Sequence, residues 1–237
     1  MTASQTVLIT GASRGIGLQL ATEFLQKGAT VVAAVRNPDG ASKLTALEHG
    51  GRLHLVRLDV ADSSTFPGST DEIKAAGISH LDIVINNAAV NPGLKPFEEI
   101  AEKDLLETFQ INTVGPFLFT QQLKKAGLIG QPGTIIANIS TLLGSIKFAE
   151  DGWDAYPLFE YRASKVALNM LTKHMDLALA KDNISVFAIS PGYVRTDMNN
   201  NSGDITVEES AQGIIKVLES GNDLRGFWNY TGDQVEW

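Results

Sequence analysis

The sequence predicts an α/β fold, a mostly parallel sheet of about seven strands with helices on both faces. Short apolar runs of strand character alternate along the chain with segments whose apolar residues recur at helical spacing. The first of these runs is followed at once by a glycine-rich turn and then by a helical segment. The 237 residues suffice for one large domain with a sizeable core, and no internal repeat or linker divides them. We therefore expect a single domain over residues 1–237.

Composition excludes several classes of function. A formal net charge of −8 argues against binding to nucleic acid and to anionic membranes. The chain has no cysteine, which removes disulfides and thiol catalysis, and its four scattered histidines predict no metal site. No apolar stretch approaches the roughly 18 residues of a membrane span, and only five residues precede the first apolar run. We expect a cytoplasmic protein that acts on a small molecule.

The N-terminal segment reads as strand, glycine turn and helix. An apolar run at Thr6 to Thr10 precedes the turn, and helical spacing from Leu18 to Lys27 follows it. Glycines there allow the backbone to approach a pyrophosphate, whose charge lies against the positive end of the helix. A tight loop without a ligand is the alternative for such a turn taken alone. The residues of the turn expected to contact a dinucleotide are Gly11, Ser13, Arg14, Gly15, Ile16 and Gly17.

The next strand indicates which dinucleotide would bind. Ala29 to Val35 completes a βαβ unit about 20 residues beyond the glycines, where an acidic residue would bind the ribose of NAD. This chain has Arg36 there instead, which suits a 2′-phosphate, and Arg14 could add a second cation. The sequence therefore favours NADP(H), and solvated surface charges are the alternative for both arginines.

The remaining elements of the first half lead to the same edge of the sheet. Asp59 and Val60 follow a strand, and the carboxylate could accept a hydrogen bond from an adenine amino group or cap the next helix. Small and amide-bearing residues, beside which a cofactor can lie closely, follow another strand at Asn87, Ala88 and Ala89. Pro67-Gly68 should keep the helix between these strands short. The predicted elements are a helix at 38–48, a strand at 53–58, a short helix within 61–77 and a strand at 81–85.

The second half continues the alternation. A long helix at 103–125 contains Asn112 and, at Gly115-Pro116, a local irregularity. Ser140 stands at the C-terminal end of the next strand. The predicted elements are a strand at 133–139, a helix at 161–181, a strand at 184–189, a helix at 207–219 and a strand at 227–230.

Tyr161 and Lys165 form a candidate acid/base pair. Four residues apart on a helix, the two side chains share one face. A lysine cation beside a phenol favours the phenolate, so we expect the pKa of Tyr161 to fall from its reference value near ~10. A chance pairing is the alternative for the two residues taken alone.

Taken together, these motifs resemble the short-chain dehydrogenase/reductase superfamily, whose fold is a Rossmann-type doubly wound sheet. The resemblance implies that Tyr161 is the general acid/base, and that Lys165 lowers its pKa and binds the nicotinamide ribose. It also implies that Ser140 hydrogen-bonds the substrate oxygen and that Asn112 holds a water that relays protons, with helix packing as the alternative for Asn112. After the strand at 184–189, the cofactor would contact Pro191, Gly192, Val194 and Thr196, although Thr196 could instead cap a helix. The motifs occur in the order Thr10-Gly11-x-x-x-Gly15-x-Gly17, Asn86-Asn87-Ala88-Ala89, Asn112, Ser140, Tyr161-x-x-x-Lys165 and Pro191-Gly192.

Two segments look like one branch of that superfamily. The run from Tyr161 to Asn169 and the segment Gly226 to Tyr230 are similar to the C-factor and Sniffer carbonyl-reductase branch, which includes fungal ketoreductases. The resemblance implies NADPH-dependent reduction of a ketone or aldehyde. It also implies a homo-oligomer, a dimer or tetramer formed through the helices at 103–125 and 161–181.

Two loops are expected to contact the substrate, at about 141–160 and 194–206. The first is longer than in many family members and carries several aromatic residues, which favours a bulky hydrophobic or aromatic carbonyl; packing in the core or at a subunit contact is the alternative. An NAD-dependent secondary-alcohol dehydrogenase and a non-catalytic NADP-binding sensor remain competing functions. The candidate substrate contacts are Leu142, Trp153, Tyr156 and Met198.

Overall fold

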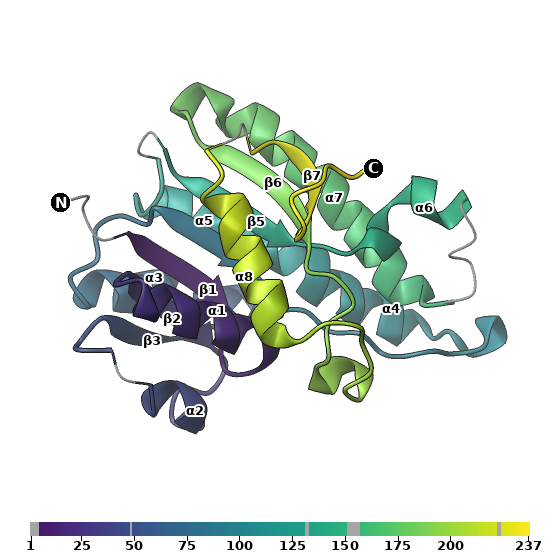
Figure 1. Ribbon diagram of the computed structural model, residues 1–237, viewed down its shortest axis with the longest axis horizontal. Helices are drawn as coiled ribbons and strands as arrows, with labels where there is room; N and C mark the ends of the chain where they lie inside the picture. Colours follow the sequence, from purple (N-terminus) through teal and green to yellow (C-terminus); the bar gives the residue numbers. More distant parts are fainter. Residues whose placement is uncertain (1–4, 48, 131–132, 151–156, 222–223) are drawn as a thin grey trace.

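Seven strands form one parallel sheet in the computed structural model, which describes residues 5–47, 49–130, 133–150, 157–221 and 224–237 (Figure 1). The strand order is β3-β2-β1-β4-β5-β6-β7, and every neighbouring pair runs parallel. The order reverses between β1 and β4, so the carboxyl ends of these two strands border the crevice where such folds bind ligands. The predicted doubly wound α/β fold is confirmed. The strands are β1 (Thr6–Thr10), β2 (Thr30–Val35), β3 (Leu53–Arg57), β4 (Ile83–Asn86), β5 (Ile135–Ile139), β6 (Ser185–Ser190) and β7 (Gly226–Asn229).

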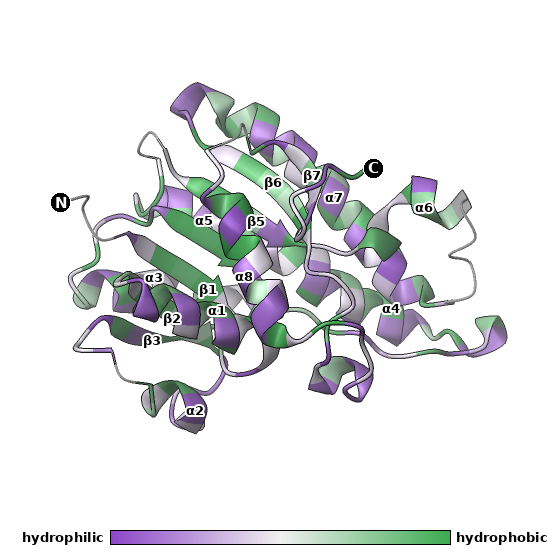
Figure 2. Cartoon of the chain, viewed as in Figure 1, coloured by the Kyte–Doolittle hydropathy of each residue, from purple (hydrophilic) through white to green (hydrophobic). Residues whose placement is uncertain are grey.

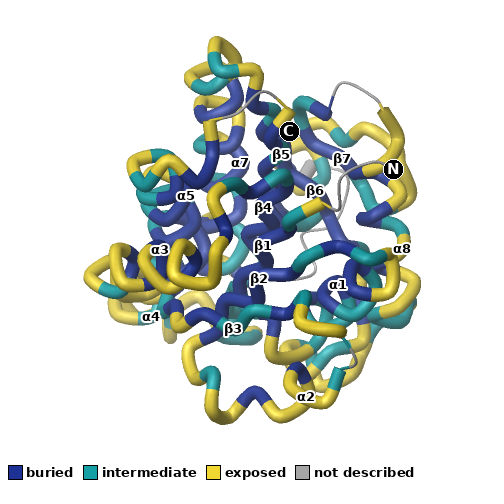
Figure 3. Tube along the Cα trace, turned by 90° about the vertical axis from the view of Figure 1, so that its left-hand side faces the viewer, coloured by how far each residue is buried: buried dark blue, intermediate teal, exposed yellow. Residues whose placement is uncertain are grey.

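Helices cover both faces of the sheet. Figure 3 shows the strands as a buried layer with α3 and α5 on one side and α1 and α8 on the other. The right-handed crossovers that parallel strands require place helices in this way. The α-helices are α1 (Gly15–Gln26), α2 (Ser42–Thr45), α3 (Phe66–Ala75), α4 (Glu102–Phe109), α5 (Gly115–Lys125), α6 (Ile146–Glu150), α7 (Phe159–Leu179) and α8 (Val207–Leu218).

Two hydrophobic cores lie on the two faces of the sheet. Alternate residues of a strand point to opposite faces, so Val7 and Ile9 pack with α1 and α8, while Leu8 packs with α3 and α5. All three side chains are fully buried. Burial on both faces explains why the strands read as continuous apolar runs, visible as green arrows in Figure 2.

Two predicted helices differ from the structure. The helix expected at 38–48 is reduced to α2, because Asn37 accepts a hydrogen bond from the Gly40 amide and shapes a turn where the helix was expected to begin. Pro67 does not break the helix after β3. It lies in the first turn of the ten-residue α3, where a missing N–H costs nothing.

The long helix expected at 103–125 is irregular, as predicted. A π-helical turn, Gln110–Val114, separates α4 from α5. At its end, a Cβ atom on Gly115 would lie 2.3 Å from the Val60 carbonyl oxygen, so only glycine fits against the loop that follows β3. The close approach brings the π-helical turn, which contains Asn112, up to the C-terminal edge of the sheet.

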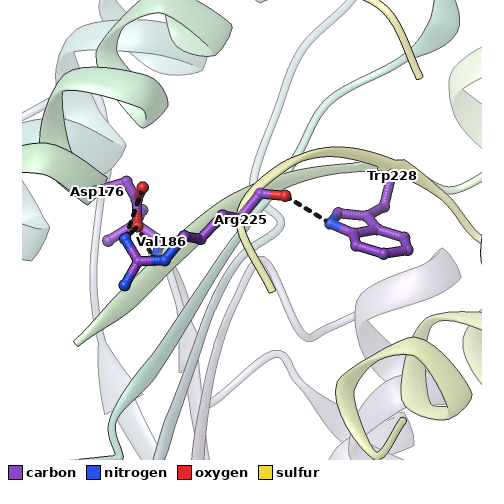
Figure 4. Close-up of polar contacts among 4 residues, drawn as sticks. All are labelled: Asp176, Val186, Arg225 and Trp228. Carbon is purple, nitrogen blue, oxygen red and sulfur yellow. Dashed lines mark hydrogen bonds and ion pairs between the residues drawn. The ribbon is translucent and has the colours of Figure 1, made fainter. Parts of the chain in front are cut away.

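An ion pair between a buried aspartate and a partly exposed arginine joins α7 to the last two strands (Figure 4). Asp176 is 2% exposed, and one of its carboxylate oxygens accepts hydrogen bonds from the Val186 amide at 3.3 Å and from Arg225 Nη1 at 3.0 Å. The carbonyl of Arg225 accepts a bond from the Trp228 indole at 2.8 Å. Because α7 carries the candidate acid/base pair, these contacts help to fix that helix against the sheet.

Candidate active site

The glycine turn after β1 packs tightly against the loop that follows β4. The Thr10 hydroxyl accepts hydrogen bonds from the backbone amides of Asn87 and Ala88, both at 3.0 Å, and the Asn87 side chain donates to the Thr10 carbonyl at 2.9 Å. A Cβ on Gly11 would lie 2.9 Å from Ala88 Cα, and one on Gly17 would lie 2.5 Å from the Gly11 carbonyl oxygen. Thr10 was not among the predicted site residues, although its place at the end of the first strand pointed to this edge.

The start of α1 suits an anionic group. Gly11 and Gly15 adopt positive φ angles of 67° and 55°, a conformation that favours glycine. Arg14 precedes the helix without making a side-chain cap, and the first turn contains no acidic residue. The first amides of the helix therefore lack a capping side chain, and the turn fits the pyrophosphate of a dinucleotide. Ser13 is exposed and Ile16 half-buried beside this turn.

Three arginines lie at or after the ends of the first three strands, at Arg14, Arg36 and Arg57. Arg14 lies 3.7 Å from Asp197, and both side chains are about two-thirds exposed. Arg36, directly after β2, is exposed, and its carbonyl accepts a hydrogen bond from Arg57 Nη1 at 3.4 Å. Sequence analysis missed Arg57. Its proximity to Arg36 comes from the parallel register, which pairs Val35 with Arg57.

Asp59 and Val60 lie at the same edge, just beyond β3. Asp59 is half-buried and accepts a hydrogen bond from the Ala61 amide at 3.0 Å, while Val60 is buried. This contact closes a local turn and does not cap a helix, because Asp62 caps the 3-10 helix that follows by accepting a hydrogen bond from the Ser64 amide. Recognition of adenine stays a prediction.

The loop after β6 lies beside the glycine turn. A Cβ on Gly15 would lie 3.6 Å from Thr196 Cγ2. The Thr196 amide donates to the Asn199 side chain at 3.1 Å, within the capping interaction foreseen as its alternative role. The loop is anchored at its start, because Ser210 Oγ donates to the Pro191 carbonyl at 2.7 Å, and the predicted contacts Gly192 and Val194 follow directly. The structure thus brings the glycine turn after β1, which holds the first predicted cofactor contacts, next to the loop after β6, which holds the last ones.

The candidate acid/base pair meets the end of β5. Lys165 is 2% exposed, and its Nζ lies 5.8 Å from the centroid of the Tyr161 ring. The same Nζ donates to the carbonyl of Ile139, the residue before Ser140, at 2.7 Å. Ser140 is itself buried and donates to Asn169 Oδ1 at 2.6 Å, one helical turn beyond Lys165. One face of α7 and the end of one strand therefore hold all three groups.

Burial controls the titration of this pair. It lowers the pKa of Lys165 to about 7 and raises the pKa of Tyr161 to about 12. The expected net fall in the tyrosine pKa is therefore wrong, because desolvation disfavours both charged forms, outweighs the effect of the lysine on the phenolate, and leaves the lysine only partly charged near neutral pH. The phenol keeps its proton, which is the state that a general acid requires.

Asn112 is buried in the π-helical turn, and contacts with the protein occupy its side-chain amide. Its Nδ2 donates to the Val90 carbonyl at 2.9 Å and to Ser164 Oγ at 3.0 Å, and its Oδ1 accepts from the Val90 amide at 2.9 Å. The side chain ties α7 to the loop after β4, in agreement with the packing alternative. The predicted role in holding a water stays a prediction.

The predicted substrate contacts are only partly visible. Leu142 is half-buried in a short 3-10 turn, Leu142–Gly144, and Met198 is 43% exposed in the loop after β6. Trp153 and Tyr156 lie outside the described residues. Part of the 141–160 loop forms the helix α6, which was not predicted.

Within the described ranges, no cluster of three or more His, Asp or Glu residues could hold a metal ion. None of the helices there is long and apolar enough to span a membrane.

Comparisons with known proteins agree with this geometry. The family model described as short chain dehydrogenase matches residues 5–205. The short-chain dehydrogenase srdF of Neurospora crassa is 32% identical, in an alignment covering 100% of this chain and 99% of the relative. Among solved structures, the NADPH-bound carbonyl reductase from chicken fatty liver is 33% identical, with a TM-score of 0.88 and 99% of each chain covered.

The carbonyl reductase Sniffer of D. melanogaster is also similar. It is 28% identical, with a TM-score of 0.87 over 99% of this chain and 100% of its own. The resemblance to the carbonyl-reductase branch is confirmed. The chain belongs to the short-chain dehydrogenase family of oxidoreductases.

Proposed function

We propose that this protein reduces a ketone or aldehyde to an alcohol with NADPH, and that Tyr161 is the general acid. The observation that carries the proposal is the position of Lys165 Nζ, which contacts both the strand end that presents Ser140 and the ring of Tyr161. A cation held beside a phenol ring and beside the strand end that carries a serine suits a reaction in which negative charge develops on one oxygen.

Each side chain has a distinct task. When bound, a nicotinamide cofactor supplies the hydride, which the side chains of this protein cannot do. Tyr161 keeps its proton at neutral pH because burial raises its pKa to about 12, so it can donate that proton to the carbonyl oxygen. Ser140 hydrogen-bonds the same oxygen, and the partly charged Lys165 stabilises the phenolate that remains.

The residues that would hold the cofactor lie along one edge of the sheet. The glycine turn fits the pyrophosphate, because its backbone leaves no room for side chains at Gly11 or Gly17 and its helix start has no acidic residue. Arg36, with Arg57 beside it and Arg14 at the glycine turn, would supply positive charge for a 2′-phosphate. The chicken carbonyl reductase, which binds NADPH, supports this preference.

Cofactor choice is tested by binding. We expect a lower Kd for NADPH than for NADH, and Arg36→Ala should raise the NADPH Kd by roughly tenfold, since one well-placed charge contact is worth about 1–2 kcal/mol. The Kd for NADH is the control and should not change. Equal effects on both cofactors, or tighter binding of NADH by the wild type, would favour an NAD-dependent alcohol dehydrogenase.

The reaction is tested with a panel of carbonyl compounds that includes bulky aromatic ketones. We expect NADPH consumption, fastest with the bulky aromatic substrates if the 141–160 loop shapes the site. Tight binding of NADPH without turnover on any of them would support a cofactor-sensing protein instead.

We also propose a homo-oligomer. Large apolar side chains are mostly exposed on α4, at Leu106, and on α7, at Met170 and Leu177, where a second copy could cover them. Light scattering should give a mass of at least 2 × 25.4 kDa. A monomeric mass would refute this proposal.

A further inference from the structure

Asn169 contacts the candidate catalytic serine directly. Ser140 Oγ donates its hydrogen bond to Asn169 Oδ1 at 2.6 Å, and the two residues are 1% and 4% exposed. A serine hydroxyl has only one hydrogen to donate. In the structure that hydrogen points to α7, so the direction of the hydroxyl is set by Asn169.

The other end of the same amide holds the turn that follows β5. Asn169 Nδ2 donates to the Gly144 carbonyl at 2.9 Å. A Cβ on Gly144 would lie 3.0 Å from Lys165 Cβ and 3.3 Å from Asn169 Nδ2, so the turn packs directly on α7. One side chain thus connects Ser140, the turn that carries Leu142, and the helix that carries Tyr161 and Lys165.

Helix geometry explains why Asn169 reaches this place. It lies four residues after Lys165, so both side chains project from the same face of α7 toward the end of β5. A polar side chain buried in mid-helix is unfavourable unless its groups are hydrogen-bonded. Here both ends of the amide have partners, and both partners belong to the candidate site.

We propose that Asn169 is a positioning residue, which orients the Ser140 hydroxyl and holds the 142–144 turn against α7 for carbonyl reduction. This inference rests on the proposed function. The Ser140 hydrogen, held by Asn169 in the free protein, turns to the substrate oxygen when a carbonyl binds, and the Asn169 oxygen remains the acceptor to which it returns. The contact with Asn169 thus fixes the rotamer of Ser140 and the position of its oxygen, and only the hydroxyl hydrogen turns in each turnover.

A double-mutant cycle on kcat tests the proposal. Ser140→Ala should lower kcat by roughly 100-fold, as loss of one donor to a developing oxyanion does. Asn169→Leu should lower kcat by about tenfold or more, with a smaller effect on KM. If Asn169 acts through Ser140, adding Asn169→Leu to Ser140→Ala should change kcat less than about twofold. Asn169→Ala, which adds no bulk, should behave in the same way.

Thr172→Val is the matched control. Thr172 is as buried as Asn169, lies three residues further along α7, and binds the side chain of Asn138 at 2.8 Å instead of Ser140. In the double variant, the fold-change in kcat caused by Thr172→Val should multiply with the fold-change caused by Ser140→Ala. If the fold-changes of Asn169→Leu and Ser140→Ala also multiply, the proposal is overturned.

Urea unfolding of the same proteins gives a second measure of the coupling between Ser140 and Asn169. The unfolding midpoints should also be non-additive for Ser140 and Asn169, because the mutations share one hydrogen bond. A wild type that consumes no NADPH with any carbonyl would refute the proposed function and the positioning role of Asn169 together. An active wild type with an additive cycle in kcat would refute the positioning role alone, whatever the midpoints show.

Discussion

The buried lysine of the site should make stability depend on pH in a defined direction. Burial lowers the pKa of Lys165 from 10.5 to about 7 in the folded chain. Between these two values the unfolded chain binds more protons at this position than the folded chain does. The free energy of unfolding therefore rises with pH through this window, by about 1.4 kcal/mol for each pH unit, and Lys165 adds no pH dependence below it.

The contribution of Lys165 to this pH dependence can be measured with Lys165→Met, which removes the titrating group but keeps an unbranched side chain. From pH 7.5 to 9.5 the wild type should gain about 2–3 kcal/mol of unfolding free energy relative to the variant. The range stops below pH 10, where the raised pKa of Tyr161 adds an opposite slope.

Urea denaturation at intervals of half a pH unit measures this difference. Lys27→Met is the control, because the Lys27 side chain is 46% exposed and pairs with Glu219 at the surface. The control should differ from the wild type by a nearly constant amount across the range. Parallel curves for the wild type and Lys165→Met would refute the claim that the lysine is held in a desolvated site.

Two further predictions concern the scaffold and the glycine turn. Asp176→Ala leaves the buried Val186 amide without its partner and should lower the free energy of unfolding by about 2–4 kcal/mol in urea denaturation. A loss below about 0.5 kcal/mol would contradict the importance given to this pair. Gly11→Ala must place a Cβ 2.9 Å from Ala88 Cα at a φ of 67°, so calorimetry should show NADPH affinity reduced by about tenfold or more. Unchanged affinity would contradict the fit of the turn to the cofactor.

Much of the fold could be predicted because parallel strands buried on both faces leave a strong signal in sequence. All seven expected strands are present, and the irregularity near Gly115 lies where the sequence placed it. The predictions that differ from the structure concern two helices for which the local sequence carries both helix and turn signals. Pro67 was expected to limit the helix after β3, but it suits the first turn of α3, and the helix expected at 38–48 gave way to a turn set by Asn37.

The candidate site could be predicted only where its residues are near one another in sequence. The spacing of Tyr161 and Lys165 predicted their shared helix face, which the structure confirms. The contacts of Thr10, Arg57 and Asn169 join segments up to 78 residues apart, and they depend on strand register and helix packing. The pKa of Tyr161 depends on burial, which a spacing argument does not include.

The most direct test of the central claim is the turnover of Tyr161→Phe with NADPH and a reducible ketone. The substitution removes one oxygen and keeps the ring beside Lys165, so the Kd for NADPH should stay within about twofold of the wild type. The kcat should fall by roughly 100-fold to 10,000-fold, the contribution of a general acid. Turnover close to that of the wild type would contradict the claim that Tyr161 delivers the proton.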